Sequence, residues 1–167
     1  ERIGPDDRPV GRLTYDSRDA GDGDCFFAVR GTARDGHDFI PTAAAAGAAV
    51  VVCESLPGDL PEGPTYVVVE NTNAAMADMA AAFYGHPSRE LELVGITGTN
   101  GKTTTVTLLY DLVRALGHRA GLISTVVYRI DDQSLEATHT TPDAIRLNEM
   151  LRRMADAGCR YCFMEVS

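Results

Sequence analysis

A glycine-rich segment that runs into lysine and threonine, ITGTNGKTTT at residues 96–105, carries the clearest chemical signal in the sequence. An apolar run precedes it and a run with helical spacing follows it, so it is predicted to be a turn between a strand and a helix. Such a turn binds phosphate, because it presents backbone N–H groups and the positive end of the helix dipole. Lys102 can then reach the β- and γ-phosphates of a nucleotide, and the Thr103 hydroxyl can bind Mg²⁺. The commonest form of this motif has glycine at position 96, where isoleucine stands, so we interpret the segment as a variant phosphate loop.

A second candidate is Glu165, an acid near the C-terminal end of the apolar run 161–166. Considered by itself, it is equally well interpreted as an exposed acid at the end of a strand. Because Mg²⁺ prefers oxygen ligands such as carboxylates, the phosphate loop upstream favours a role for Glu165 in metal binding.

The elements that must position these residues alternate between strands and helices. Hydrophobic patterning predicts strands at 13–15, 25–29, 48–53, 66–70, 91–97, 120–130 and 161–166. Helices are expected at 39–46, from a cap at Asn73 to about residue 83, at 103–116 with Val106, Leu109, Val113 and Leu116 on one face, and from a cap at Thr141 to Gly158. The alternation predicts an α/β fold with a mostly parallel sheet in the second part. The Gly- and Pro-containing segment 85–90 is the expected boundary between domains at 1–88 and 89–167.

Composition limits the classes of partner. The net charge of the 167 residues is −9, which argues against a general nucleic-acid binder. There is no apolar run of membrane-spanning length and the first residues lack a signal-peptide core, so a cytoplasmic protein without membrane insertion is expected. The pair Cys159 and Cys162 has the spacing of a zinc or redox motif, but no second pair accompanies it, so a structural role is favoured.

Five stretches together resemble the Mur ligases, the ATP-dependent amino-acid ligases of peptidoglycan synthesis. The loop GTNGKTT resembles their ATP loop, a likeness shared with folylpolyglutamate synthase and cyanophycin synthetase. TYDSR at 14–18 and FFAVRGTARDGHDFI at 26–40 resemble the uridine-nucleotide-binding N-terminal domain of the MurE branch. THTTPD at 138–143 and MEVS at 164–167 resemble the central-domain segments that hold the muramoyl substrate and the metal.

The resemblance implies a role for each matching residue. ATP would be bound by the loop residues Gly98, Thr99, Asn100, Gly101, Lys102, Thr103 and Thr104, with Lys102 and Glu165 catalytic and Thr103 and Glu165 as Mg²⁺ ligands. The nucleotide-sugar would contact Tyr15, Ser17, Thr32, Ala33 and Arg34, and the muramoyl peptide would contact His139, Thr140, Thr141 and Ser167. Residues 32–34 depart from the His-Gln-Ala of some members. No role is assigned to His37, His86 or His118, and Arg152 and Arg153 are expected to be solvated at the end of a helix.

The activity implied by the resemblance is ATP- and Mg²⁺-dependent ligation. An amino acid, meso-diaminopimelate or L-lysine, would be joined to UDP-N-acetylmuramoyl-L-alanyl-D-glutamate through an acyl phosphate. Because the family has further strands and a C-terminal domain, we expect the chain to be the N-terminal part of a longer ligase, with a truncated central ATPase domain that is inactive alone. Three alternatives stay open: a non-catalytic nucleotide-sugar-binding module, a related Mur-type ligase with another substrate, and a kinase- or GTPase-like enzyme.

Overall fold

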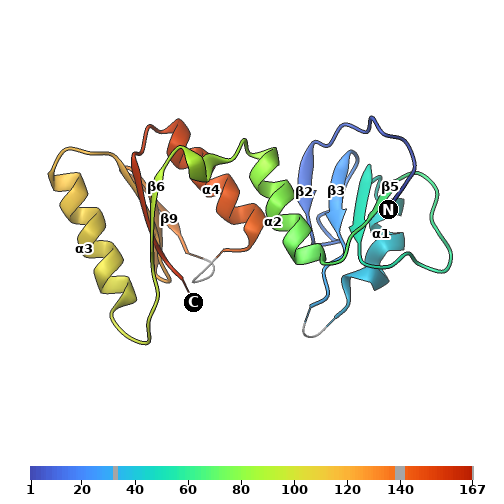
Figure 1. The fold of residues 1–167 in the computed structure, drawn as a ribbon, viewed down its shortest axis with the longest axis horizontal. Helices are drawn as coiled ribbons and strands as arrows, with labels where there is room; N and C mark the ends of the chain where they lie inside the picture. Colours follow the sequence, from blue (N-terminus) through green and yellow to red (C-terminus); the bar gives the residue numbers. More distant parts are fainter. Residues whose placement is uncertain (32–33, 138–141, 167) are drawn as a thin grey trace. The chain divides into compact units, whose positions relative to one another are not determined.

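The computed structural model describes residues 1–31, 34–137 and 142–166. It divides into two compact units, Glu1–Met79 and Ala80–Ser167, each built on a β-sheet with helices against it (Figure 1). This architecture confirms the predicted α/β class. The division falls inside α2 (Thr72–Phe83), whereas the sequence analysis expected it after residue 88. The assignment of separate binding roles to 1–88 and 89–167 stays a prediction.

The sheet of the first unit has the strand order β1-β5-β4-β3-β2. Strands β2 to β5 pair in parallel and β1 pairs antiparallel to β5. Strand β4 reads VVVC and all four side chains are buried, as expected for a parallel strand that is covered on both faces. The strands are β1 (Arg2–Ile3), β2 (Arg12–Thr14), β3 (Asp24–Phe27), β4 (Val50–Cys53) and β5 (Thr65–Val68).

The helical segments of the first unit begin at side-chain caps. The predicted helix at 39–46 is present as a 3₁₀ turn, η1 (Gly36–Phe39), that continues into α1 (Ile40–Ala45). The Asp35 carboxylate caps η1 by accepting from the His37 N–H. Helix α2 begins before the predicted cap, because Asn71 rather than Asn73 accepts the Ala74 N–H at 2.8 Å.

The sheet of the second unit has the order β6-β10-β7-β8-β9. Strands β6, β10 and β7 are parallel, and β8 and β9 continue the sheet antiparallel. The predicted extended run 120–130 is two strands, because the Ser124 hydroxyl accepts from the Val126 and Val127 N–H groups and turns the chain. The strands are β6 (Glu92–Ile96), β7 (Ala120–Ile123), β8 (Val127–Ile130), β9 (Gln133–Glu136) and β10 (Tyr161–Glu165), of which β9 was not predicted.

Two helices cover opposite faces of this second sheet (Figure 1). Helix α3 (Lys102–Ala115) packs Val106 and Tyr110 against one face, which includes Leu122 and Phe163. Helix α4 (Ala144–Asp156) packs Met150 and Met154 against the other. Alternate residues of β7 enter the two cores, as the pleat of a strand requires: Ala120 and Leu122 face α3, and Ile123 faces α4.

Two details of these helices differ from the sequence prediction. Leu116 was predicted on the buried face of α3, but it is 67% exposed because it lies at the C-cap, after the last helical residue. The expected cap of α4, Thr141, lies outside the described residues, and the Asp143 carboxylate caps the helix by accepting from the Arg146 N–H at 2.9 Å. A short 3₁₀ turn, η2 (Pro87–Arg89), precedes β6.

The four cysteines lie in the hydrophobic interiors of the two units, two in each. All are buried as free thiols, and burial raises the pKa of Cys25 and Cys162 to about 12, which keeps both protonated at neutral pH. Within the described ranges, the helices are too short or too polar to span a bilayer.

At Gly121 in β7, the hydrophobic core between the second sheet and α4 has no room for a larger side chain. A Cβ at this position would lie 2.2 Å from the Sδ atom of Met154, which is fully buried. Gly121→Ala is therefore expected to lower the free energy of unfolding by about 1–3 kcal/mol through overpacking. Thermal melts followed by circular dichroism test this. The control is Gly58→Ala, where a Cβ meets nothing within 4 Å. Equal melting temperatures for the two variants would contradict the packing argument.

Candidate functional site

The glycine-rich loop connects the end of β6 at Ile96 to the start of α3 at Lys102. Gly98 and Gly101 have φ values of 142° and 80°, which glycine adopts at little cost. Gly101 is the N-cap of α3 and supplies no side-chain acceptor for the first turn. A Cβ built at either glycine meets nothing within 4 Å, so the space beside the loop is open. The loop thus presents uncapped N–H donors and a helix N-terminus, the arrangement that binds phosphate.

The charged side chain of this loop lies across it. The Lys102 Nζ donates to the Gly98 carbonyl oxygen at 2.6 Å, so the ammonium lies over the glycine-rich turn. Lys102 and Thr103 are half-buried, whereas Thr99, Asn100 and Thr104 are exposed. A cation beside uncapped N–H groups makes the loop locally positive although the chain as a whole is acidic.

Glu165 lies beside this loop at the end of the neighbouring strand. In the parallel pairing of β10 with β6 it is opposite Ile96, after which the loop begins. Its side chain is only 1% exposed. The Thr125 N–H donates to Oε1 and the Thr125 Oγ1 donates to Oε2, each at 3.0 Å. Thr125 follows β7, so three adjacent parallel strands bring the loop, Glu165 and Thr125 to the same edge of the sheet.

Sequence reasoning missed Thr125. The available signal was a pair of hydroxyl residues, Ser124 and Thr125, directly after a buried apolar strand. That signal is weak, because such pairs also make ordinary turns. Thr125 is recognised as part of the candidate site only from its hydrogen bonds to Glu165 on the neighbouring strand.

The donors at this edge suit Mg²⁺. No cluster of three or more His, Cys, Asp or Glu side chains able to hold a metal is found among the described residues. Mg²⁺ does not need one, because it usually takes one or two protein oxygens and completes its shell with water and substrate phosphates. Glu165 contributes carboxylate oxygens and Thr103 a hydroxyl oxygen, which are the kinds of donor that Mg²⁺ takes.

The first unit has a cleft of about 490 Å³ at the carboxyl ends of its strands. Residues 15–18 follow β2, and Arg34 and Phe39 follow β3. The cleft brings together three of the predicted nucleotide-sugar contacts, Tyr15, Ser17 and Arg34. The other predicted contacts, Thr32, Ala33, His139, Thr140, Thr141 and Ser167, lie outside the described residues.

The charges in this cleft are partly paired. Arg18 is bidentate to the Asp16 carboxylate, with Nε 2.9 Å from Oδ1 and 3.1 Å from Oδ2. The Arg18 guanidinium and N–H together lower the pKa of Asp16 to about 2, so Asp16 stays ionised. Arg34, from the segment after β3, brings a further guanidinium to the cleft. Tyr15 is 46% exposed and offers an aromatic ring at the same opening.

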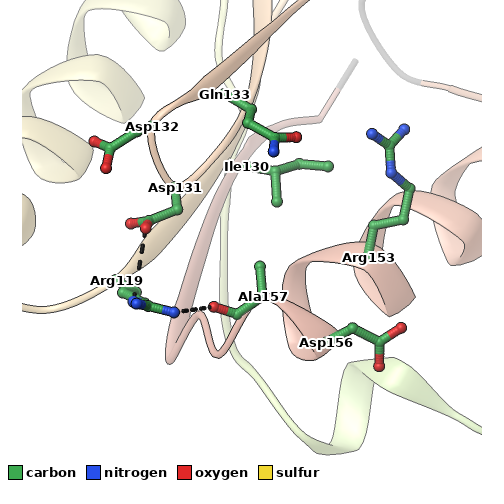
Figure 2. A pocket seen from close by; sticks show the side chains of 8 residues that line it. All are labelled: Arg119, Ile130, Asp131, Asp132, Gln133, Arg153, Asp156 and Ala157. Carbon is green, nitrogen blue, oxygen red and sulfur yellow. Dashed lines mark hydrogen bonds and ion pairs between the residues drawn. The ribbon is translucent and has the colours of Figure 1, made fainter.

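A second cavity, of about 550 Å³, lies at the other end of the second sheet (Figure 2). Its walls include Arg119, before β7, and Gln133, the first residue of β9. Arg119 donates to the Ala157 carbonyl at 2.7 Å and is 3.6 Å from Asp131. The glycine-rich loop follows the carboxyl end of β6, so it lies at the opposite end of the parallel strands from this cavity.

Arg152, expected to be solvated, is instead half-buried at the end of α4. It forms ion pairs with Glu90 at 2.6 Å and with Asp156 at 2.8 Å. These carboxylates raise its pKa, and the pairs tie the end of α4 to the segment before β6.

Comparison with known proteins agrees with this geometry. Residues 9–84 match the model described as Mur ligase family, catalytic domain, and residues 96–167 match the Mur ligase middle domain. The chain is 51% identical over 164 residues to the UDP-N-acetylmuramoyl-L-alanyl-D-glutamate–2,6-diaminopimelate ligase of Bacteroides fragilis, covering 98% of the chain and 34% of that protein. It is 50% identical to the protein of the same name from Phocaeicola vulgatus, over 100% of the chain and 34% of that protein.

Solved structures lead to the same family. A UDP-N-acetylmuramoyl-L-alanyl-D-glutamate–2,6-diaminopimelate ligase matches with a TM-score of 0.77 and 25% identity, over 99% of this chain and 34% of that chain. The fold is also that of MurF from Thermotoga maritima, solved with ADP, with a TM-score of 0.60 and 24% identity over 92% of this chain and 31% of that one. The chain spans about a third of the length of the relatives that it matches. The chain belongs to the Mur ligase family, whose N-terminal and middle domains it contains.

Proposed function

We propose that the chain supplies the nucleotide-sugar-binding and ATP-binding parts of a ligase that joins 2,6-diaminopimelate to UDP-N-acetylmuramoyl-L-alanyl-D-glutamate. The observation that carries the proposal is the edge of the second sheet where the loop around Lys102 lies beside a buried, oriented Glu165. The 51% identity to a diaminopimelate ligase over almost the whole chain supports the choice of substrates. ATP and Mg²⁺ are the co-substrate and the metal of this proposal.

The loop residues have a defined task in this reaction. The N–H groups at the start of α3 and the Lys102 ammonium bind the phosphates of ATP and neutralise charge on the transferred phosphoryl group. Mg²⁺, when bound by Thr103 and Glu165, supplies further neutralisation of the phosphate oxygens. Two hydrogen bonds from Thr125 hold the Glu165 carboxylate in one orientation at the end of β10.

The reaction needs no protein nucleophile. A carboxylate oxygen of the D-glutamate residue attacks the γ-phosphorus of ATP, and ADP leaves. The amine of the incoming amino acid then attacks the acyl carbon, and inorganic phosphate leaves. The protein must therefore hold two anions in contact and balance their charge, which is the work of positioned cations and dipoles.

The cleft of the first unit is assigned to the uridine diphosphate part of the substrate. Arg34 offers a guanidinium suited to phosphate, Tyr15 an aromatic face and Ser17 a hydroxyl. Its volume of about 490 Å³ lies in the range of small-molecule sites. In this proposal the phosphates of ATP bind near Lys102 in the second unit, and the nucleotide-sugar binds near Arg34 in the first. This accounts for a cationic group at the carboxyl ends of the strands in both sheets of an acidic chain.

Lys102→Met tests the ATP part of the proposal. Loss of a charge-assisted bond to phosphate is expected to weaken Mg²⁺-ATP binding roughly 10- to 100-fold, measured by isothermal titration calorimetry. Binding of UDP-N-acetylmuramoyl-L-alanyl-D-glutamate is expected to be unchanged. Leu108→Ala, an exposed position on the same helix, is the matched control. Unchanged ATP binding in Lys102→Met would leave a non-catalytic nucleotide-sugar-binding module as the better account.

Thr125→Ala tests the metal assignment. The variant keeps the N–H that donates to Glu165 Oε1 and loses the hydroxyl that donates to Oε2. We expect the Mg²⁺ concentration that half-saturates ATP binding to rise about tenfold, because a bond to a charged group is lost. Thr125→Ser keeps the hydroxyl and is expected to titrate like the wild type. Identical Mg²⁺ titrations for the alanine and serine variants would refute the role of Thr125, and an unchanged titration in Glu165→Gln would refute that of Glu165.

A further inference from the structure

His37 is a largely buried side chain at the centre of a hydrogen-bond network in the first unit. Its ring is 12% exposed. Nδ1 lies 2.6 Å from Oδ1 of Asp35, and Nε2 accepts from the Glu54 N–H at 2.9 Å, with the Ser55 N–H at 3.4 Å. Three partners on two segments of the chain thus surround one imidazole.

The partners determine which nitrogen carries the proton. A backbone N–H can only donate, so Nε2 must present its lone pair to Glu54. Nδ1 then carries the hydrogen and donates it to the Asp35 carboxylate. In this tautomer the His37 ring acts as a donor on one side and an acceptor on the other.

This ring joins the segment after β3 to the end of β4. Asp35 and His37 belong to the connection between β3 and α1, while Glu54 directly follows β4. Arg30 reinforces the junction, with Nε 3.6 Å from Asp35 and 3.2 Å from Glu54. Glu54 also accepts the Thr72 N–H at 3.0 Å, at the first turn of α2.

The same connection carries residues of the nucleotide-sugar cleft. Arg34 lies three residues before His37 and Phe39 lies two residues after it, and both line the cleft. Between Arg34 and His37 in the sequence, the Gly36 N–H donates to the Val29 carbonyl at 2.9 Å. A Cβ at Gly36 would lie 2.6 Å from the Val29 backbone, so the approach is as close as glycine allows. Arg30 and the Gly36–Val29 hydrogen bond also hold this part of the chain. His37 adds the hydrogen bond from the Glu54 N–H, which links it to the residue after β4.

We propose that His37 is a positioning residue of the nucleotide-sugar site: by donating to Asp35 and accepting from the Glu54 N–H, it holds the segment that presents Arg34 and Phe39 to the cleft. The inference rests on the proposed function of that cleft. It adds a residue that does not line the cleft and that acts through the two that do. The hydrogen bonds, rather than the volume of the ring, are what the position requires.

Two substitutions separate hydrogen bonding from packing. His37→Leu fills much of the same space without polar atoms, whereas His37→Gln can place an amide oxygen near the position of Nε2 and restore the acceptor for Glu54. Calorimetry with UDP-N-acetylmuramoyl-L-alanyl-D-glutamate is expected to show affinity at least tenfold weaker for the leucine variant. The glutamine variant is expected within about threefold of the wild type. Binding of Mg²⁺-ATP at the second unit is the control and is expected to be unchanged in both.

The outcomes distinguish this inference from the proposal on which it rests. Wild-type affinity in His37→Leu, with weakened binding in Arg34→Ala, would overturn the role of His37 and leave the assignment of the cleft intact. If the leucine variant does not fold, the glutamine variant decides: wild-type affinity supports the role of the acceptor, and affinity as weak as that of Arg34→Ala overturns it. A wild-type protein that binds Mg²⁺-ATP but not the uridine nucleotide would overturn both proposals.

Discussion

The insertion of β10 between β6 and β7 is the constraint on which the proposed phosphate site depends. Strands β6 and β7 precede β10 in the sequence, and β10 pairs in parallel with both. The pairing extends past the strand itself, since the Val166 N–H donates to the Ile96 carbonyl at 2.9 Å. A slip of one residue would turn Glu165 to the opposite face of the sheet. The register therefore decides whether a carboxylate lies beside the loop at all.

The pairing of β10 with β7 also builds the two surfaces on which α3 and α4 pack. Phe163 and Leu122 contact α3 on one face of the sheet, and Cys162 and Ile123 belong to the core under α4 on the other. The glycine-rich loop follows β6, the edge strand, which pairs along its whole length with the covered strand β10. The loop and Thr125 both lie in turns beyond the carboxyl ends of these strands.

Although the chain is acidic, a cationic side chain lies at each of the two proposed ligand sites. With a net charge of −9, the surface as a whole repels phosphates. Many of its arginines are paired away from the sites, as Arg114 is with Asp131 and Arg152 with Glu90. Lys102 and Arg34, by contrast, lie at the loop and the cleft. Screening by salt confines each field to about 8 Å at physiological ionic strength, so these local charges outweigh the distant excess of acids at the ligand.

The sequence by itself determined the features whose cause is local. Glycine spacing predicted the turn before α3. Apolar runs predicted most strands and all four α-helices to within a few residues. Both succeed because hydrophobic periodicity and the backbone freedom of glycine are properties of a short stretch of sequence. The tertiary structure decided which distant residues meet. It put Thr125 on Glu165, 40 positions away, and the Glu54 N–H on His37, a histidine that no pattern distinguished. It also made Asn71 rather than Asn73 the cap of α2, and Asp143 the cap of α4. Hydrogen bonds across strands depend on register and on strand order, and neither is encoded in the spacing of residues along one segment.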